Sequence, residues 1–587
     1  MSILVELSEK IRNAFLECGY EVDGKLVTLS DRPDLSQFQS NTAFIVAKKN
    51  GINPVKLSEE VIKKLENDTD LSKVFVAGPG FINVVLDNNF LSSYIERNFS
   101  KIDLTKYNCD KKRIIIDYGG PNVAKPLHVG HLRPAIIGEG LKRLSRELGN
   151  EIIGDVHLGD WGRQMGLVIS EIKLRQPNLI YFDDQYSGEY PDCCPVTVEE
   201  LNELYPTANC AAKNDEARME EARNATFILQ NKDHKNHRGY YELWKQLVKT
   251  SVSDLKKTYE KLDIHFDLWR GESDCNNSIP KLLEILSEKN MIETSDGATV
   301  VYVNEEGDKV DYPPVILKTK NNTVGYQTTD LATIYERLEE FDPDEIWYVV
   351  DARQKLHFDQ IFRVAYRSGM VDESKKLVFI GFGTMNGTDG KPFKTRDGGV
   401  MRLSELLDIT ENKAFEKITN ISIEKSEKQE IACLVADASL KYADAISNRL
   451  TDYVFDIDKF TDNNGKTGPY ILYSQVRIQS LLEKANVQGI KEGNLLAPSS
   501  KEELNVMLEI IKLPDVIISA YNNKSLLEIA DFLFYLNSSF NNLYNNCRIL
   551  DEKNIERRAS LLKLIRIVGD INKKLLYIMS IRIPKRM

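Results

Sequence analysis

The spacing of apolar residues changes twice along the chain and divides it into three parts. Residues 1–108 combine helical spacing with short alternating strands, which predicts a compact α+β domain. Residues 109–407 alternate short β-branched runs with helical patterns, and this order is typical of a doubly wound parallel sheet of the Rossmann type. From residue 408 onward the spacing is almost purely helical and predicts an all-α bundle. We therefore expect a multidomain α/β protein.

The middle part contains the strands of the expected parallel sheet. These strands share a run of Ile, Val or Phe between polar turns, and we expect them at 114–117, 152–157, 300–303, 346–350 and 378–382. A long polar, helical stretch near 170–295 interrupts them, and we interpret it as an insertion between the two halves of the sheet. The helical remainder is expected to divide into a connecting region, 408–462, and a final helical domain, 463–587.

Bulk properties restrict the class of protein. At 587 residues, of which 42% are hydrophobic, the chain is long enough for about three or four globular domains. No apolar run approaches ~20 residues, and the charges at Glu6, Glu9 and Lys10 come too early for a secretory signal. Eight scattered cysteines without a C-x-x-C pair predict reduced thiols and no zinc ribbon. We expect a cytoplasmic protein without a membrane span.

The net charge of −11 describes the molecule as a whole and does not exclude a local basic surface. Residues 555–587 contain nine Lys or Arg against two Asp or Glu, so a basic face is available for a polyanion. A solvated helical surface explains the same residues equally well. His234 and His237 lie among Lys and Asn residues, and we interpret them as solvated surface.

The turn that runs from Pro121 to His131 has the pattern of a phosphate site. It follows the apolar strand pattern at 113–118 and precedes a long helical pattern. Unpaired N–H groups at a helix start favour an anionic phosphate. His128 and His131 are three residues apart and can face one ligand, while Gly130 lets a flat ring approach the backbone. A capped helix with two surface histidines is the alternative interpretation.

The tetrapeptide at 128–131, His-Val-Gly-His, resembles the HIGH signature of class I aminoacyl-tRNA synthetases. The longer run 117–133, with Gly-Asp-Trp-Gly at 159–162, resembles the arginyl-tRNA synthetases. The likeness extends to the N-terminal part and to residues 466–478 in the helical part. Pro134 departs from the small hydroxyl residue that the family pattern has there, although a first helical turn tolerates proline.

This resemblance implies a ligase that attaches L-arginine to its tRNA. In such a reaction the arginine carboxylate attacks the α-phosphorus of ATP to form arginyl-adenylate, and arginine then passes to the 2′-hydroxyl of the terminal adenosine. The substrate supplies the nucleophile, so the protein positions the reactants and stabilises charge on the triphosphate. ATP would bring Mg²⁺, held largely by phosphate oxygens and water, so no protein metal site is expected. The resemblance also implies a monomer.

The resemblance assigns His128 and His131 to the ATP phosphates and Gly130 to close approach of the nucleoside. Lys125, just upstream, is a further catalytic candidate, because members of the family with a degenerate second signature use a lysine there.

The segment 390–399 resembles that second signature, the KMSKS loop, with Lys391 and Lys394 in the places of its two lysines. Glycines on both sides suit a loop that closes over the triphosphate. A lysine-bearing loop on solvated surface is the alternative.

Arginine presents a planar fork of donors that a carboxylate can meet with two parallel bonds. The resemblance places Tyr326 and Asp330 at this guanidinium, and Asp117, Asn122 and Gln354 at the α-amino end and backbone of the amino acid. Asp330 precedes a helical pattern, so a plain helix cap explains it equally well. A pocket that pairs with a cation rejects uncharged analogues, so we expect no editing activity.

The resemblance also indicates which parts of the chain contact the tRNA. The anticodon is expected on the C-terminal bundle, with bases stacked on Tyr470 and on arginine side chains. Phe81 and Asn83 are candidates for contact with the tRNA elbow, with an ordinary strand as the alternative. The insertion near 170–295 is expected to be structural or to face the tRNA.

Two other functions fit parts of the sequence. A small-molecule adenylyltransferase shares the histidine pattern but does not need the N-terminal domain or the helical end. A non-catalytic tRNA-binding relative would not need both histidines and the carboxylates. An NAD-dependent enzyme is disfavoured, because no G-x-G-x-x-G follows the first strand of the expected sheet.

Overall fold

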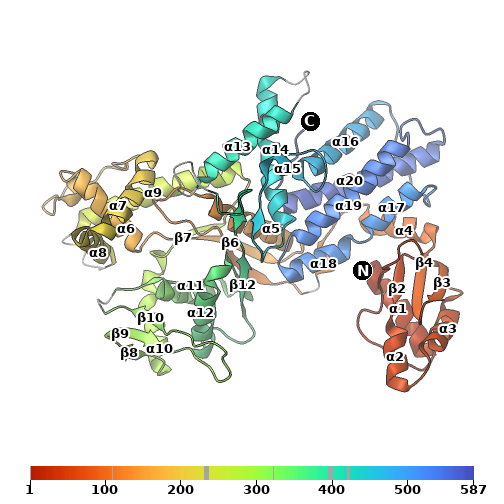
Figure 1. The fold of residues 1–587 in the computed structure, drawn as a ribbon, viewed down its shortest axis with the longest axis horizontal. Helices are drawn as coiled ribbons and strands as arrows, with labels where there is room; N and C mark the ends of the chain where they lie inside the picture. Colours follow the sequence, from red (N-terminus) through yellow and green to blue (C-terminus); the bar gives the residue numbers. More distant parts are fainter. Residues whose placement is uncertain (1, 109, 231–236, 321–322, 394–400, 419–423) are drawn as a thin grey trace.

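The computed structural model describes residues 2–108, 110–230, 237–320, 323–393, 401–418 and 424–587. Figure 1 shows an elongated molecule with the parallel sheet near its centre. The helices of the C-terminal part (blue) lie on one side, next to the N-terminal domain (red), and a group of yellow helices projects on the other. Among the residues described, no helix has both the length and the apolar character needed to cross a membrane.

The N-terminal domain is an antiparallel sheet covered by helices, as the α+β prediction requires. Its apolar core is continuous with that of the C-terminal helices. The strands are β1 (Thr28–Leu29), β2 (Phe38–Ser40), β3 (Leu71–Ala77) and β4 (Phe81–Leu86), and the helices are α1 (Ile3–Glu17), α2 (Thr42–Asn50), α3 (Pro54–Leu65) and α4 (Asn88–Phe99).

The central sheet has parallel strands in the order β12-β11-β5-β6-β7. They are β5 (Arg113–Asp117), β6 (Glu151–Leu158), β7 (Leu268–Gly271), β11 (Glu345–Asp351) and β12 (Lys376–Phe382). The chain builds outward from β5 through β6 to β7 and then returns to the other side of β5, so the strand order reverses between β5 and β11. Three isoleucines make β5 suitable for this buried central place.

The expected strand at 300–303 does not belong to the parallel sheet. It corresponds to the middle strand of a separate antiparallel sheet of β8 (Glu293–Ser295), β9 (Ala298–Val301) and β10 (Val315–Lys318). Asp296 and Gly297 both have positive φ, and a two-residue turn of this kind joins antiparallel neighbours. Parallel neighbours need a longer crossover, so this turn makes β8 and β9 antiparallel, and β10 occupies the other edge of β9.

A strand also lies inside the stretch near 170–295 that we interpreted as a helical insertion. This strand, β7, pairs with β6 and forms the edge of the parallel sheet. Its sequence, Leu-Trp-Arg-Gly, is short and half polar, so it lacks the apolar run that marks the other strands. The domain bounds themselves stay predictions.

Helices cover both faces of the sheet and then form the C-terminal part. The helices of the middle part are α5 (Leu132–Glu147), α6 (Arg163–Arg175), α7 (Val198–Asn214), α8 (Glu216–Gln230), α9 (Arg238–Lys261), α10 (Ile279–Glu288), α11 (Tyr326–Phe341) and α12 (Lys355–Arg367). Of these, α6, α7 and α8 pack on one another in the group that projects from the sheet. The short strand β13 (Met385–Asn386) pairs with β14 (Tyr453–Val454). The helices that follow β13 are α13 (Leu403–Lys417), α14 (Lys425–Ala445), α15 (Ile457–Phe460), α16 (Gly468–Val487), α17 (Lys501–Ile510), α18 (Leu513–Asn523), α19 (Leu527–Asn546) and α20 (Ile555–Ile578).

Helix α5 begins directly after the predicted phosphate turn and is buried from Leu132 to Ser145. Arg133, in its first turn, is almost completely buried: its Nε donates to Oδ2 of Asp444 at 2.8 Å, and its Nη1 donates to the carbonyl of Gly383 at 2.7 Å. Pro134 lies within this first turn and does not interrupt the helix. The start of α5 is therefore fixed against both α14 and the end of β12.

Candidate functional site

Four chain segments meet at one edge of the parallel sheet. Asp117 ends β5, Gly159 follows β6, Glu272 follows β7, and Gln354 lies just beyond β11. The carboxyl ends of parallel strands lie at the same edge, and doubly wound folds bind ligands where the strand order reverses, here between β5 and β11.

The predicted histidine pair lies at this edge, in a short 3₁₀ helix, Val129–His131, that leads into α5. Nδ1 of His128 accepts a hydrogen bond from the N–H of Gly130 at 3.1 Å, and Nδ1 of His131 accepts one from the N–H of His128 at 3.1 Å. The ring centroids are 3.9 Å apart. Because each Nδ1 is an acceptor, a neutral ring carries its proton on Nε2, from which it can be donated to a ligand.

Both histidines are held in the neutral form. Burial, together with the nearby His128 and Lys125, lowers the pKa of His131 to about 3. Burial and Lys125 also lower the pKa of His128. Near neutral pH the pair therefore offers hydrogen bonds rather than positive charge, and a phosphate bound here must be neutralised by lysines or by a cation that accompanies it.

Gly130 has a steric role that differs from the predicted one. A Cβ on this residue would lie 2.8 Å from Cε1 and 2.9 Å from Nδ1 of His128. The space that glycine leaves open is thus occupied by the neighbouring imidazole itself. Close approach of a nucleoside stays a prediction.

Backbone pairing connects the histidine turn to the second predicted motif. The N–H of Val129 donates to the carbonyl of Met401 at 3.2 Å, and the N–H of Met401 donates to the carbonyl of Phe393 at 3.2 Å. Phe393 and Met401 are the described residues on either side of Lys394, which itself lies outside the described part of the chain, as does His234. The flanks of the two motifs, distant in sequence, are therefore neighbours in the fold.

The other predicted lysines lie in different surroundings. Lys391 is exposed in a turn, and its carbonyl accepts a hydrogen bond from the N–H of Gly387 at 2.8 Å. Nζ of Lys125 lies 3.9 Å from the ring centroid of Tyr205 in α7, which is a cation–π contact. The predicted insertion thus contacts a lysine that we assigned to phosphate.

A cavity of about 860 Å³ opens at this edge of the sheet. Helices α6, α7 and α8 form one wall, and the segment that leads into α11 forms another. Of the predicted arginine-binding residues, Asn122 and Tyr326 line the cavity, whereas Asp117, Asp330 and Gln354 do not. The volume falls within the range of small-molecule sites.

Asp330 lies in the second turn of α11, with its Oδ2 2.6 Å from Nε2 of His357. Gly325 is the cap of that helix, so the alternative interpretation of Asp330 as a helix cap is wrong. The ring of Tyr326, at the start of the same helix and 62% exposed, lies 5.0 Å from the ring of His357. The two residues predicted to bind a guanidinium therefore share one neighbour.

Asp117 is placed differently from the other predicted carboxylate. Nη2 of the buried Arg337 donates to Oδ2 of Asp117 at 2.7 Å and to Oδ2 of Asp155 at 2.6 Å. Burial raises the pKa of Asp117, and Arg337 opposes the rise. Asp117 thus belongs to an internal ion cluster, which leaves little of its charge for an α-amino group. Gln354 is exposed at the start of α12.

Glu272 also lines the cavity, although it was not among the site residues predicted from the sequence. Burial raises the pKa of Glu272 to about 7, with His157 opposing the rise and Asp330 and Asp160 adding to it. Burial likewise raises the pKa of Asp160 to about 6. Acidic groups close enough to disfavour each other's ionisation favour a bound cation. The sequence feature that could have identified Glu272 is its position directly after a strand, but β7 is too short to be recognised from its sequence.

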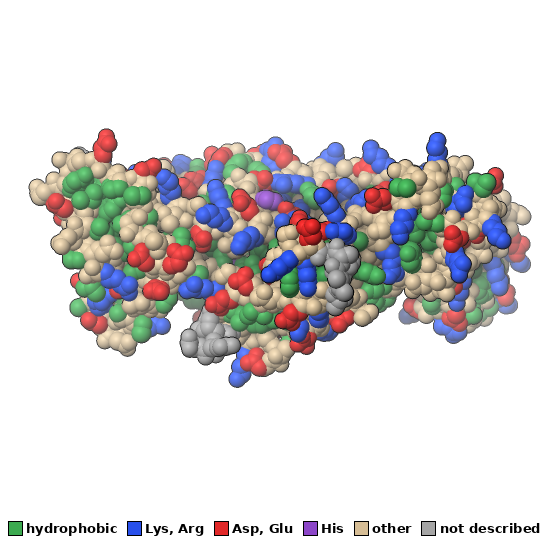
Figure 2. All heavy atoms as spheres, turned by 90° about the horizontal axis from the view of Figure 1, so that it is seen from above, with side chains coloured by type: hydrophobic (Ala, Val, Ile, Leu, Met, Phe, Trp, Pro, Cys, Tyr) green, Lys and Arg blue, Asp and Glu red, His purple; other side chains and the backbone are tan. Residues whose placement is uncertain are grey.

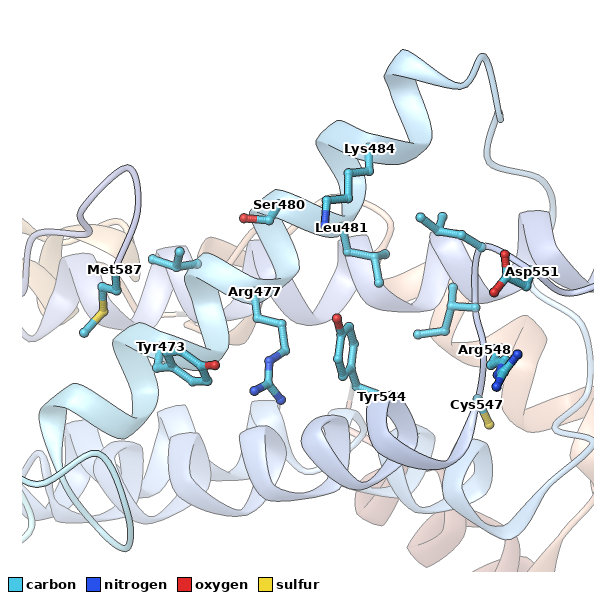
Figure 3. Close-up of a pocket in the computed structure, with 13 residues that line it drawn as sticks. Tyr473, Arg477, Ser480, Leu481, Lys484, Tyr544, Cys547, Arg548, Asp551 and Met587 are labelled. Carbon is cyan, nitrogen blue, oxygen red and sulfur yellow. The ribbon is translucent and has the colours of Figure 1, made fainter. Parts of the chain in front are cut away.

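A second cavity, of about 510 Å³, lies in the C-terminal helices (Figure 3). The guanidinium of Arg477 lies between two rings, 4.7 Å from the centroid of Tyr473 and 4.8 Å from that of Tyr544. Tyr470, the predicted stacking residue, does not line this cavity. Its hydroxyl instead accepts from Nδ2 of Asn541 at 3.1 Å within the helix packing.

The two candidates in the N-terminal domain lie in β4. The ring of Phe81 packs on that of Phe44 with centroids 5.0 Å apart and is half-buried. Asn83 is buried: its Oδ1 accepts from the hydroxyl of Ser36 at 2.8 Å, and its Nδ2 donates to the carbonyl of Phe81 at 3.2 Å. The ordinary strand interpretation fits Asn83, whose side chain is not presented to a partner.

Comparisons with known proteins identify the family. Residues 97–457 match the family described as tRNA synthetases class I (R), catalytic domain. Residues 3–86 match the arginyl tRNA synthetase N-terminal domain, and residues 471–587 match the DALR anticodon binding domain. The arginine–tRNA ligase of Alkaliphilus oremlandii is 44% identical over 593 residues, with 100% of both chains covered. The chain belongs to the arginyl-tRNA synthetase family.

Another relative and two solved structures agree with this family and with its fold. The arginine–tRNA ligase of Agathobacter rectalis is 43% identical over 597 residues, with 99% of both chains covered. The arginyl-tRNA synthetase of Plasmodium falciparum superposes with a TM-score of 0.81 at 25% identity, over 100% of this chain and 99% of that one. The Thermus thermophilus enzyme, at 19% identity and a TM-score of 0.78 with 100% of both chains covered, shares the fold. The predicted family and fold class are confirmed.

The first testable consequence concerns Gly130. In Gly130→Ala the new Cβ would displace the His128 ring, so we expect the rate of tRNA charging to fall about tenfold or more while arginine binding is unchanged. Gly120→Ala is the matched control, because its Cβ would meet nothing closer than 3.7 Å. Equal charging rates for Gly130→Ala and the control would exclude the histidine geometry from the reaction.

The second consequence concerns pH. Glu272, with its pKa raised to about 7, is mostly protonated and neutral at pH 6 and mostly ionised at pH 8. A guanidinium binds the ionised form better, so the KM for arginine should fall by up to about tenfold as the pH rises across this window. Glu272→Gln should remove the dependence. The same pH profile in Glu272→Gln would show that Glu272 does not contact the substrate.

Proposed function

We propose that this chain attaches L-arginine to its cognate tRNA with ATP, through an arginyl-adenylate and with release of diphosphate. Its membership of the family supports this reaction. The observation that carries the proposal is the meeting of two chemically different sites at one sheet edge. A pair of neutral histidines at a helix start lies at the same sheet edge as a cavity lined by two carboxylates, Glu220 and Glu272.

At the phosphate end, His128 and His131 donate hydrogen bonds from Nε2 to the triphosphate, and their geometry is set before ATP arrives. Lys125 supplies positive charge, as do Lys391 and Lys394 from the second motif. Mg²⁺ arrives with ATP and is held by phosphate oxygens and water. No side chain acts as nucleophile, because the arginine carboxylate attacks the α-phosphorus directly.

At the amino-acid end, Tyr326 and Asp330 receive the guanidinium, with Glu272 as a second carboxylate. Asn122 and Gln354 hold the backbone of the amino acid. Asp117 contributes through its ion pair with Arg337, which stabilises the end of β5, more than by direct contact. An uncharged side chain would leave the negative charges of Asp330 and Glu272 without a positive partner, which explains selection without editing.

The cavity between α16 and α19 is the proposed anticodon site. Tyr473 and Tyr544 offer ring faces for bases, with Arg477 between them. Figure 2 shows Lys and Arg side chains gathered over the middle of one face of the molecule, with acidic side chains interspersed, so a net negative chain still presents positive surface to a polyanion. A monomeric, cytoplasmic enzyme is part of the proposal.

Charging of unfractionated tRNA with each of the twenty amino acids, with and without Mg-ATP, tests the function. We expect ATP-dependent incorporation of arginine alone. In the same assay Tyr544→Ala should raise the KM for tRNA about tenfold, because base stacking is worth about 1–3 kcal/mol. Tyr302→Ala, which removes an exposed tyrosine elsewhere, is its control. Absence of arginine incorporation by the folded protein would contradict the proposal.

A further inference from the structure

His357 occupies a special place among the residues around the cavity. It is the third residue of α12 and follows the end of β11 closely. Its Nε2 lies 2.6 Å from Oδ2 of Asp330, and its ring lies 5.0 Å from that of Tyr326. The His357 side chain is 14% exposed. It is not among the residues that line the cavity, and of its two neighbours Tyr326 lines it.

The hydrogen bonding defines the form of the imidazole. An ionised carboxylate can only accept, so Nε2–H of His357 is the donor to Asp330. Nδ1 is buried, and none of the described residues is its hydrogen-bond partner. A doubly protonated ring would bury an unpaired N–H in addition to a charge, which is costly. The geometry therefore fits a neutral ring with its proton on Nε2.

A neutral donor has a specific advantage beside a site for a cation. An arginine or lysine in place of His357 would neutralise Asp330 and compete with the incoming guanidinium. The neutral imidazole orients the carboxylate and leaves its charge available. Asp117 shows the contrast within the same site, since its partner is the buried cation of Arg337.

We propose that His357 is the positioning residue for arginine recognition. It holds the carboxylate of Asp330 by a hydrogen bond and the ring of Tyr326 by contact, so that both are set for the guanidinium before it binds. Two parallel hydrogen bonds demand a fixed carboxylate plane, and a freely rotating Asp330 would lose part of that geometry. This inference rests on the proposed assignment of Tyr326 and Asp330 to arginine.

Variants of His357 separate the donor from the ring. His357→Phe keeps a ring against Tyr326 but removes the donor, and we expect the KM for arginine to rise about tenfold or more with the KM for ATP changed less than about twofold. His357→Gln keeps a neutral donor near the Nε2 position and should stay within about threefold of the unaltered protein. His265→Phe removes another histidine–aspartate pair, with Nε2 3.1 Å from Asp263, and should change neither KM.

Coupling between the side chains of His357 and Asp330 distinguishes a positioning role of His357 from simple packing. If His357 acts through Asp330, the double variant His357→Phe/Asp330→Asn should raise the KM for arginine no more than Asp330→Asn does alone. Multiplicative effects would overturn the proposal. The thermal midpoint of each variant shows whether it folds, and His357→Met, a second variant without a donor, takes the place of His357→Phe if the latter does not.

The same measurements separate two kinds of failure. If Asp330→Asn leaves the KM for arginine unchanged, the proposed assignment of arginine to this site is wrong. If Asp330→Asn raises that KM and His357→Phe does not, the assignment stands and the role of His357 is overturned.

Discussion

Helix α5 is buried along almost its whole length although it contains ionisable side chains, and the rest of the structure depends on how these are paired. An unpaired buried charge is strongly destabilising, so each needs a partner, either within α5, where Glu139 pairs with Lys142 and Arg143, or in another segment. Arg133 is paired with Asp444 of α14. Arg143 donates to the carbonyl of Asp263 at 2.6 Å and to that of Tyr577, in α20, at 3.1 Å. These contacts hold the histidine turn, the end of α9 and the C-terminal helices in one arrangement.

The site that this helix start defines meets two opposite electrostatic demands a short distance apart. A triphosphate needs donors and positive charge, and it finds neutral histidines with Lys125 nearby. A guanidinium needs negative charge, and it finds Glu272, which lines the cavity, and Asp330 close enough to raise the pKa of Glu272; a bound cation offsets this repulsion. Neutral imidazoles suit both ends: they donate hydrogen bonds to phosphate, and His357 orients a carboxylate without cancelling its charge.

Local patterns made the family, the fold class and the histidine turn predictable, because a strand, a turn and a helix start are contiguous in sequence. Tertiary pairing was not predictable in the same way. Nothing near Asp330 in sequence indicates that His357 meets it, and β7 is too short to reveal that Glu272 follows a strand. That Tyr473 lines the cavity and Tyr470 does not depends on which side of α16 faces the cavity, and that is set by packing against α19.

The central claim is that carboxylates at this sheet edge recognise the positive charge of arginine, and equilibrium dialysis tests it most directly. L-arginine and L-citrulline have almost the same shape, but citrulline lacks the charge. The account predicts that arginine binds about a hundredfold tighter than citrulline, because the uncharged analogue supplies no positive charge to Asp330 and Glu272. It also predicts that Asp330→Ala removes most of this preference. Equal affinity for the two amino acids would contradict the account.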